Sequence, residues 1–322
     1  MLRVGMIGYG YWGPKIVRNL ESLCNAKLGM ICDRNLIARS RAVVAHPAVP
    51  LTGDAAELIG SSAIDAVAVI TTVRSHYELA KAALLNGKHV FVEKPFTASS
   101  AQAQELIELA ASRRLTLMVD HTFLFTGAAR TIRRLIDEGS LGKLHGYEST
   151  RTNISTHRQD VNVVWDLAPH DLAILSYLLD AEPQAIVATG EGQLEHSANL
   201  TAYFPQEFIA RIDLRWSSPQ KIRKISISAE RKTLLWDDLE QIEKVKVYDR
   251  AICEAGIDCD AGEYFAPSLE HDEAIQACLQ HFVHCVESGA TPICNGVAGM
   301  KVVKTLEAAQ QSMKCGGRLV EL

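Results

Sequence analysis

Residues 3–14 of the chain read RVGMIGYGYWGP. A short apolar run leads directly into the pattern Gly-x-Gly-x-x-Gly at positions 8–13, and a proline follows where a helix would begin. In this order Gly8 permits a tight turn, Gly10 lets the backbone approach a pyrophosphate, and Gly13 allows close packing of the helix. The N-terminus of that helix favours an anion. The stretch therefore predicts a dinucleotide-binding loop, which also contains Tyr11 and Trp12.

A carboxylate at the end of the second predicted strand bears on the choice of dinucleotide. Asp33 stands twenty residues beyond Gly13, where its side chain would accept hydrogen bonds from the adenosine ribose and repel a 2′-phosphate. Arg34 follows it, and a guanidinium there can stack on adenine or pair with a 2′-phosphate. We expect NAD as the cofactor, with NADP as the alternative. A glycine-rich turn that binds no dinucleotide is the other interpretation of the motif.

Strand and helix patterns alternate over the first 120 residues. The predicted strands cover residues 3–7, 27–32, 64–70, 89–92 and 115–119. Between the third and fourth, Ser75 followed by Glu78 has the form of a capping box at the start of a helix. Strands that alternate with helices form parallel, doubly wound sheets, so residues 1–120 are predicted to be a dinucleotide-binding Rossmann domain of the α/β class.

The pattern changes after residue 120. One helix, 128–138, is followed by long strand-like runs at 146–152, 200–204, 208–216, 222–229 and 244–248, and helical patterns at 273–287 and 300–313 close the chain. We expect residues 121–322 to form a second, α+β domain on a large, mostly antiparallel sheet that presents the substrate.

Composition excludes several classes of protein. Charged residues make up 22% of the 322 and the formal net charge is −5, without a block of like charges, so nucleic acid is not an expected partner. The N-terminus lacks a signal-like segment and no apolar stretch is long enough to span a bilayer, so no membrane association is expected. The eight cysteines contain no C-x-x-C pair and are expected to be the reduced thiols of a cytoplasmic protein.

Two further motifs carry candidate chemistry. Glu93-Lys94-Pro95 follows the fourth predicted strand, at the carboxyl edge where doubly wound sheets bind ligands. Asp166 and His170 lie four residues apart near the start of a predicted helix, and hence on one face. Oxidation of an alcohol needs a base for the hydroxyl proton, which a histidine can accept near neutral pH, while a lysine can hold the same oxygen. A helix cap, a surface histidine and a solvated lysine are the alternative interpretations.

Together these motifs resemble the glucose-fructose oxidoreductase, inositol dehydrogenase and rhizopine catabolism family (Gfo/Idh/MocA), and the resemblance spans essentially the whole chain. It implies that Lys94, Asp166 and His170 are the catalytic group, and that Glu93 and Lys94 adjoin the nicotinamide ribose. It further implies that Thr71, Thr72 and His76 line the cofactor cleft. A homo-oligomer, dimer or tetramer, assembled through the second domain is also implied.

Within the family the chain resembles the nucleotide-sugar 3-dehydrogenases. The resemblance is carried by the sequence Gly-Tyr-Trp-Gly-Pro in the loop, by residues 121–124 (HTFL) and by residues 160–171 (DVNVVWDLAPHD). It implies a UDP-N-acetylglucosamine substrate whose C3 hydroxyl becomes a ketone. A partner aminotransferase would convert that ketone to an amine for lipid A or surface-glycan precursors.

Two departures from the wider family pattern affect the predicted substrate contacts. Val163-Val164-Trp165 replace a glycine-rich stretch, and residues 122–128 lack the usual Arg and Pro. Candidate partners for a diphosphate or sugar are Arg151, Arg158 and Asn162, because guanidinium groups suit phosphate geometry. Ordinary surface or interface residues are the alternative for these three.

Other functions stay open. The same chemistry could act on another free sugar, inositol or a deoxysugar nucleotide, and a non-catalytic dinucleotide sensor could share the fold. His281, His284 and Cys285 share a helix face but are interpreted as packing, because no further metal ligand has suitable spacing and hydride transfer needs no metal. Trp216 and Trp236 are likewise interpreted as sheet packing.

Overall fold

The structure is a computed structural model that describes residues 1–154, 160–191, 196–249 and 263–322. The chain forms two compact units. Unit 1 comprises Met1–Phe125 and Asp272–Val303, and unit 2 comprises Thr126–His271 and Lys304–Leu322. The observed division at residue 125 lies close to the predicted one at 120. The two divisions also differ in a second segment: residues 272–303, which were predicted to belong to the second domain, pack with unit 1.

Unit 1 is built on a six-stranded parallel sheet in the order β3-β2-β1-β4-β5-β6. Its strands are β1 (Leu2–Ile7), β2 (Ala26–Cys32), β3 (Leu51–Thr52), β4 (Ala66–Val69), β5 (His89–Glu93) and β6 (Leu117–Asp120). β4 is buried along its whole length, as expected for a strand covered by helices on both faces. This strand order confirms the predicted Rossmann architecture.

The helices of unit 1 follow from local signals. They are α1 (Gly13–Glu21), α2 (Leu36–Ala45), α3 (Ala55–Gly60), α4 (Val73–Leu85), α5 (Ser100–Arg113), the 3₁₀ turn η1 (Thr122–Phe125) and α8 (Ala274–Ser288). The side chains of Asn35 and Ser99 cap α2 and α5. The predicted capping box was wrong, because α4 begins after Thr72 and Ser75 lies inside it. There the Ser75 hydroxyl donates to Thr71 Oγ1, 2.8 Å away.

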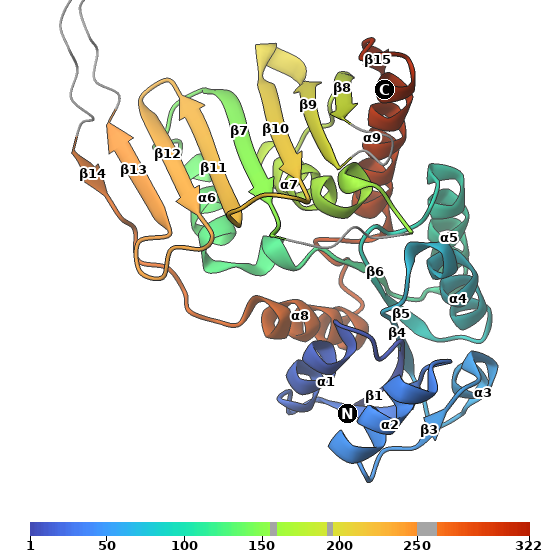
Figure 1. The fold of residues 1–322 in the computed structure, drawn as a ribbon. Coiled ribbons are helices and arrows are strands. Elements are labelled where there is room, and N and C mark those ends of the chain that lie inside the picture. Colours follow the sequence, from blue (N-terminus) through green and yellow to red (C-terminus); the bar gives the residue numbers. More distant parts are fainter. Residues whose placement is uncertain (155–159, 192–195, 250–262) are drawn as a thin grey trace, which may run out of the picture. The chain divides into compact units, whose positions relative to one another are not determined.

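Unit 2 is built on a nine-stranded sheet in the order β14-β13-β12-β11-β7-β10-β9-β8-β15, in which only the pair β7 and β10 is parallel (Figure 1). Its strands are β7 (Leu144–Thr152), β8 (Ala185–Glu191), β9 (Ser197–Tyr203), β10 (Ile209–Arg215), β11 (Ile222–Ala229), β12 (Lys232–Asp237), β13 (Val245–Asp249), β14 (Tyr264–Phe265) and β15 (Val320–Glu321). The sequence missed β8, β12, β14 and β15, and the mostly antiparallel sheet is confirmed.

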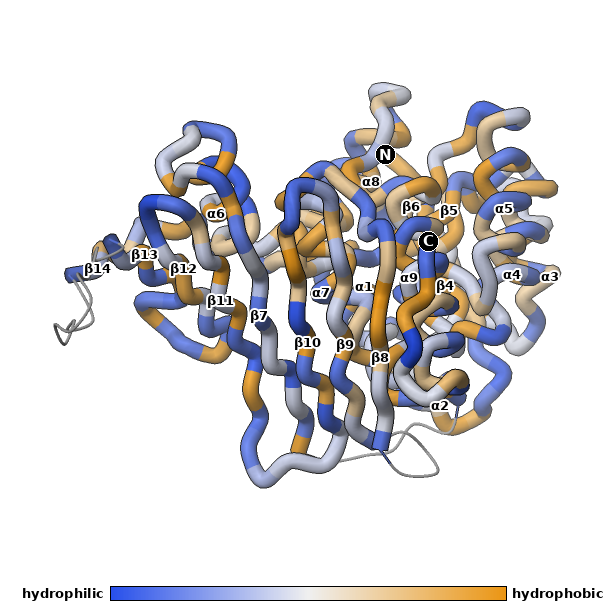
Figure 2. The backbone as a smooth tube through the Cα atoms, turned by 90° about the horizontal axis from the view of Figure 1, so that it is seen from above, coloured by the Kyte–Doolittle hydropathy of each residue, from blue (hydrophilic) through white to orange (hydrophobic). Residues whose placement is uncertain are grey.

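One face of this sheet is covered by helices. α6 (Gly127–Asp137) and α7 (Val163–Leu179) pack together, and α7 lies against β9 and β10. The last helix, α9 (Gly296–Lys314), contributes its second half to unit 2. Strand residues alternate in burial, as in β10, where Ile212 and Leu214 are buried and Arg211 is exposed; Figure 2 shows the matching alternation of hydropathy along this strand. No helix in the described ranges is long and apolar enough to cross a membrane.

A buried ionic network fastens α7 to β7. Asp171, fully buried, accepts hydrogen bonds from Tyr147 Oη at 2.8 Å and from Arg151 Nε at 2.9 Å. Burial raises the pKa of the Tyr147 hydroxyl, so this group remains a donor at neutral pH. The two hydrogen bonds to Asp171 hold α7, the helix that carries Asp166 and His170, in a fixed register on the sheet.

We predict that Asp171→Ala lowers the free energy of unfolding by about 3–5 kcal/mol, because it leaves the Arg151 guanidinium buried without its counter-charge. Tyr147→Phe removes one neutral donor and should cost about 1 kcal/mol. Urea unfolding measures both. Asp137→Ala is the control, since its ion pair with Arg133 is exposed and contributes about 0–1 kcal/mol. Equal effects of Asp171→Ala and Asp137→Ala would contradict the role of the network.

Candidate active site

The glycine-rich loop has the geometry that its sequence predicts. Gly8 adopts φ +101°, and a Cβ there would lie 2.2 Å from the carbonyl oxygen of Ile70. A Cβ on Gly13 would lie 2.7 Å from the Gly8 oxygen, so the loop and the start of α1 require both glycines. A Cβ on Gly10 would meet no atom within 4 Å. The protein's own packing therefore does not require Gly10, whose exposed backbone is open to a close ligand.

Two aromatic residues and a lysine lie on the outer side of this loop. Tyr11 and Trp12 are exposed, and the Lys15 ammonium lies 4.0 Å and 4.2 Å from their ring centroids. Lys15 was not singled out from the sequence. A cation in the first turn of a helix opposes the helix dipole, which is the signal that could have identified it as a partner for an anion.

Asp33 links the loop to the end of β2. Its Oδ2 accepts a hydrogen bond from the Tyr9 backbone N–H at 2.6 Å, and its Oδ1 accepts one from the Asn35 N–H at 2.7 Å. Arg34 is exposed beside it, and Arg39, which no sequence motif indicated, donates to the Asp33 carbonyl oxygen at 3.0 Å. The carboxylate thus lies among several cations at the edge of the sheet.

His76 is buried and connects the ends of β4 and β5. Its Nδ1 lies 2.9 Å from the carbonyl oxygen of Pro95, and its Nε2 lies 3.1 Å from that of Thr71. Thr71 is half-buried and Thr72 exposed at the start of α4. His76 therefore positions the backbone on both sides of the predicted nicotinamide edge.

Lys94 follows β5 in unit 1, and its side chain is buried. Glu93 pairs in register with Asp120 of β6, and their carboxyl groups share a hydrogen bond. Burial raises the pKa of Asp120, which also bonds to the Thr122 hydroxyl and lies 3.7 Å from the Cys278 thiol. Asp120 was not predicted from the sequence. Its position directly after a buried strand was the available signal.

Asp166 and His170 lie in unit 2, on the first two turns of α7. Asn162 caps this helix by accepting from the Trp165 N–H at 3.0 Å, so Asp166 is not the cap. Asp166 is buried, and its Oδ2 accepts from Trp216 Nε1 at 2.9 Å. His170 is half-buried. Trp216 is buried just after the end of β10, and its indole N–H orients the Asp166 carboxylate, which strand periodicity could not indicate.

The predicted substrate contacts have mixed locations. Arg151 is buried in the network with Asp171, so a contact between Arg151 and a diphosphate stays a prediction. Arg158 lies outside the described residues. Asn162 is engaged as the cap of α7, and its role toward substrate also stays a prediction.

The histidine and cysteine cluster of α8 packs within unit 1. His281 Nε2 accepts a hydrogen bond from the Ile293 N–H at 3.0 Å and lies 3.6 Å from Cys285 Sγ, while His284 points to the exposed side. Among the residues that the structure describes, no group of three His, Cys, Asp or Glu side chains could hold a metal ion.

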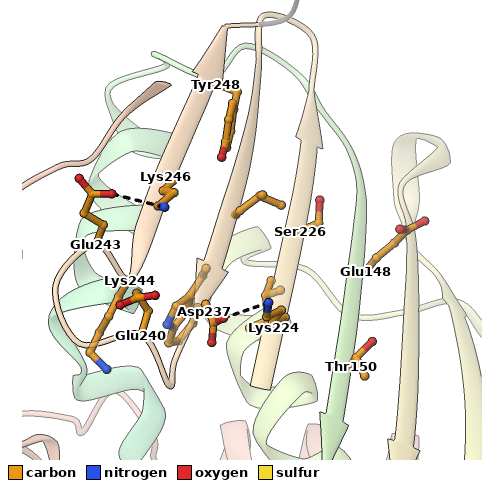
Figure 3. Close-up of a pocket in the computed structure, with 13 residues that line it drawn as sticks. Glu148, Thr150, Lys224, Ser226, Asp237, Glu240, Glu243, Lys244, Lys246 and Tyr248 are labelled. Atoms are coloured by element: carbon orange, nitrogen blue, oxygen red, sulfur yellow. Dashed lines mark ion pairs between the residues drawn. The ribbon is translucent and has the colours of Figure 1, made fainter. Parts of the chain in front are cut away.

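A pocket of about 400 Å³ lies on the open face of the nine-stranded sheet, and it contains none of the predicted site residues. Its walls carry two ion pairs, Lys224 with Asp237 at 3.2 Å and Lys246 with Glu243 at 3.3 Å (Figure 3). Leu235 and Tyr248 add apolar surface between these charges.

Comparison with known families identifies both halves of the chain. Residues 2–121 match the oxidoreductase family with an NAD-binding Rossmann fold, GFO/IDH/MocA, and residues 129–235 match the GFO/IDH/MocA C-terminal domain. The chain belongs to the Gfo/Idh/MocA oxidoreductase family. The predicted family, the enzyme class and NAD as cofactor are thereby confirmed.

Individual members of the Gfo/Idh/MocA family differ in how much of the chain they match. The UDP-N-acetylglucosamine 3-dehydrogenase of Acidithiobacillus ferrooxidans is 26% identical over 94% of both chains, and its solved structure superposes with a TM-score of 0.85 at 98% coverage of each. The uncharacterized oxidoreductase YdgJ of Escherichia coli is 32% identical, but the match covers 63% of this chain and 60% of YdgJ. An Agrobacterium radiobacter oxidoreductase solved with NAD⁺, L-tartaric acid and magnesium has a TM-score of 0.86 at 19% identity, covering 99% and 98% of the two chains.

The residues of unit 1 fit NAD. The open side of Gly10 and the N-terminus of α1, which has no acidic residue in its first turn, suit a pyrophosphate. Asp33 stands where a carboxylate would meet the adenosine ribose.

We predict that Asp33→Asn weakens NAD binding and raises the ratio of NADP to NAD affinity at least about tenfold, because the neutral amide no longer repels a 2′-phosphate. Titration with NADH and NADPH, followed by fluorescence, measures both constants. If the variant weakens both cofactors equally, Asp33 acts only through the loop hydrogen bonds to Tyr9 and Asn35.

Trp216→Phe tests the orientation of Asp166. The variant keeps an aromatic ring in the sheet but removes the donor to Oδ2, and such a bond to a charged group contributes about 1.5–3 kcal/mol. We expect kcat to fall about tenfold or more with a folded protein, as judged by circular dichroism. Trp236→Phe, a buried tryptophan on β12, is the matched control and should leave kcat unchanged. Equal kcat values for the two variants would show that the bond does not matter for turnover.

Proposed function

We propose that this protein is an NAD-dependent dehydrogenase that oxidises the C3 hydroxyl of a nucleotide sugar, with UDP-N-acetylglucosamine as the substrate. The observation that carries the proposal is the similarity over 94% of both chains to a UDP-N-acetylglucosamine 3-dehydrogenase. Lys94, Asp166 and His170 support it, because these side chains supply the groups that alcohol oxidation requires.

The chemistry divides between a base and a positioned cation. His170 would accept the proton of the C3 hydroxyl, which becomes a carbonyl as the C3–H bond breaks. Bound NAD⁺ supplies the acceptor for the two electrons and the hydrogen of that bond. Lys94 would hold the reacting oxygen, and its ammonium stabilises negative charge as the proton leaves. Asp166, oriented by Trp216, would fix His170 or bind a neighbouring sugar hydroxyl.

The open face of the nine-stranded sheet supports the proposal of a homo-oligomer. Leu235 is 40% exposed and Tyr264 44% exposed on this side, among charged residues of both signs. A mixed surface of this kind suits a self-complementary contact between two copies.

The 3-keto product would serve an aminotransferase, since a ketone is the substrate that transamination needs.

The proposed activity predicts a rise in absorbance at the reduced-nicotinamide band when the protein meets NAD⁺ and UDP-N-acetylglucosamine. A glutamate-dependent aminotransferase in the assay removes the ketosugar and draws the reaction forward. His170→Ala should lower kcat by about 10²–10⁴-fold, and Lys94→Ala should lower it similarly. His284→Ala and Lys27→Ala, both exposed, are the matched controls and should retain wild-type rates.

A panel of substrates separates the alternatives. If free sugars, inositol or a deoxysugar nucleotide give the rise and UDP-N-acetylglucosamine does not, the chemistry stands and the substrate is wrong. If no polyol gives NADH while NADH still binds, the protein is a dinucleotide sensor rather than a dehydrogenase.

A further inference from the structure

His121 is a buried histidine whose two ring nitrogens find no hydrogen-bond partner among the described residues. Its side chain is 2% exposed. It follows Asp120, the last residue of β6, and its backbone is held by bonds from its N–H to the Val119 oxygen and from the Leu124 N–H to its own oxygen. The backbone of His121 is thus held at the carboxyl edge of the parallel sheet.

Another buried histidine in the same unit shows that the fold can satisfy such a ring. His76 is also fully buried, and both of its nitrogens face backbone carbonyl oxygens. Buried polar atoms without partners are rare in folded proteins, because each loses its hydrogen bonds to water. The contrast between His121 and His76 indicates that the partners of His121 come from outside the chain.

The surroundings of His121 select the kind of partner. Burial, and secondarily the nearby Lys94 ammonium, lower the pKa of His121 to about 4, so the ring is neutral at physiological pH. A neutral imidazole offers one N–H donor and one acceptor. Lys94 and the hydrogen-bonded carboxyl pair of Glu93 and Asp120 already supply charges of both signs beside it. An uncharged group that donates or accepts a hydrogen bond therefore fits this environment.

The sheet topology indicates which ligands carry that group. The glycine-rich loop follows β1, and Asp33 follows β2 on the side predicted for the adenosine. β4, β5 and β6 lie on the other side of β1, toward which the nicotinamide half of a dinucleotide extends. His121 follows the outermost of these strands, next to Lys94.

We propose that His121 is a ligand-binding residue that forms a hydrogen bond with an uncharged group, either the nicotinamide carboxamide or a hydroxyl of the substrate. The carboxamide assignment depends only on NAD binding. The hydroxyl assignment rests on the proposed function.

The test compares His121→Leu with His76→Leu in the full chain. Leucine has a similar volume but no polar atom. In His121→Leu, the melting temperature of the ligand-free protein should stay the same or rise, because no internal hydrogen bond is lost. His76→Leu should melt at a lower temperature, since it loses the hydrogen bond that the ring N–H donates to a backbone carbonyl oxygen, that of Pro95 or that of Thr71.

Two binding measurements on His121→Leu identify the ligand. If the dissociation constant of NADH rises about tenfold and the KM of the sugar is unchanged, the partner of His121 is the nicotinamide carboxamide. If the KM of the sugar rises about tenfold and NADH binding is unchanged, the partner is a substrate hydroxyl. The NADH measurement stands even if the wild type oxidises none of the sugars tested. His121→Asn retains a donor and an acceptor and should recover much of the loss. If the leucine variant does not fold, His121→Phe, which also has no polar side-chain atom, is measured in its place. Unchanged NADH binding and unchanged KM in a folded apolar variant of His121 would overturn the proposal.

Discussion

The turn at Gly8 is the constraint on which the cofactor side of the structure depends. The carbonyl oxygen of Ile70, at the end of β4, occupies the space where any other residue would carry its Cβ. Gly8 also donates its N–H to the Cys32 oxygen at 2.8 Å, so one residue joins the ends of β1, β2 and β4. Because these three ends meet at Gly8, the loop, Asp33 and Thr71 share one edge, and the dinucleotide site follows from a steric requirement.

Unit 2 relies on a different constraint, the burial of charge beneath one helix. α7 carries two buried carboxylates, and each has an explicit partner: Asp171 has Arg151 and Tyr147, and Asp166 has Trp216. A buried carboxylate is tolerated only when such partners satisfy it, so these bonds fix both the height and the rotation of α7. His170 lies between the two carboxylates along the chain, so the bonds that fix α7 also fix the position of its backbone.

Sequence patterns predicted the helices, strands and turns that short stretches of neighbouring residues determine. The strand, glycine loop and helix around residues 3–21, and the long periodic runs of the second sheet, are local signals and were found. The pattern could not reveal that residues 272–303 pack with unit 1, since tertiary contacts decide it. β12 was missed because its apolar residues, 234–236, are consecutive, so the run KTLLWD shows no alternation. The bond between Trp216 and Asp166 joins residues fifty positions apart, and no pattern in one sequence reports it.

In the proposed reaction, hydrogen leaves the C3 position of the nucleotide sugar for the cofactor. UDP-N-acetylglucosamine carrying deuterium at C3 tests it directly, with the NADH formed analysed by mass spectrometry. We expect the deuterium to appear in NADH in proportion to the sugar oxidised, and Lys94→Ala and His170→Ala to suppress both the labelling and the oxidation. NADH that forms without deuterium, or deuterium that stays on the sugar while another position is oxidised, would contradict it.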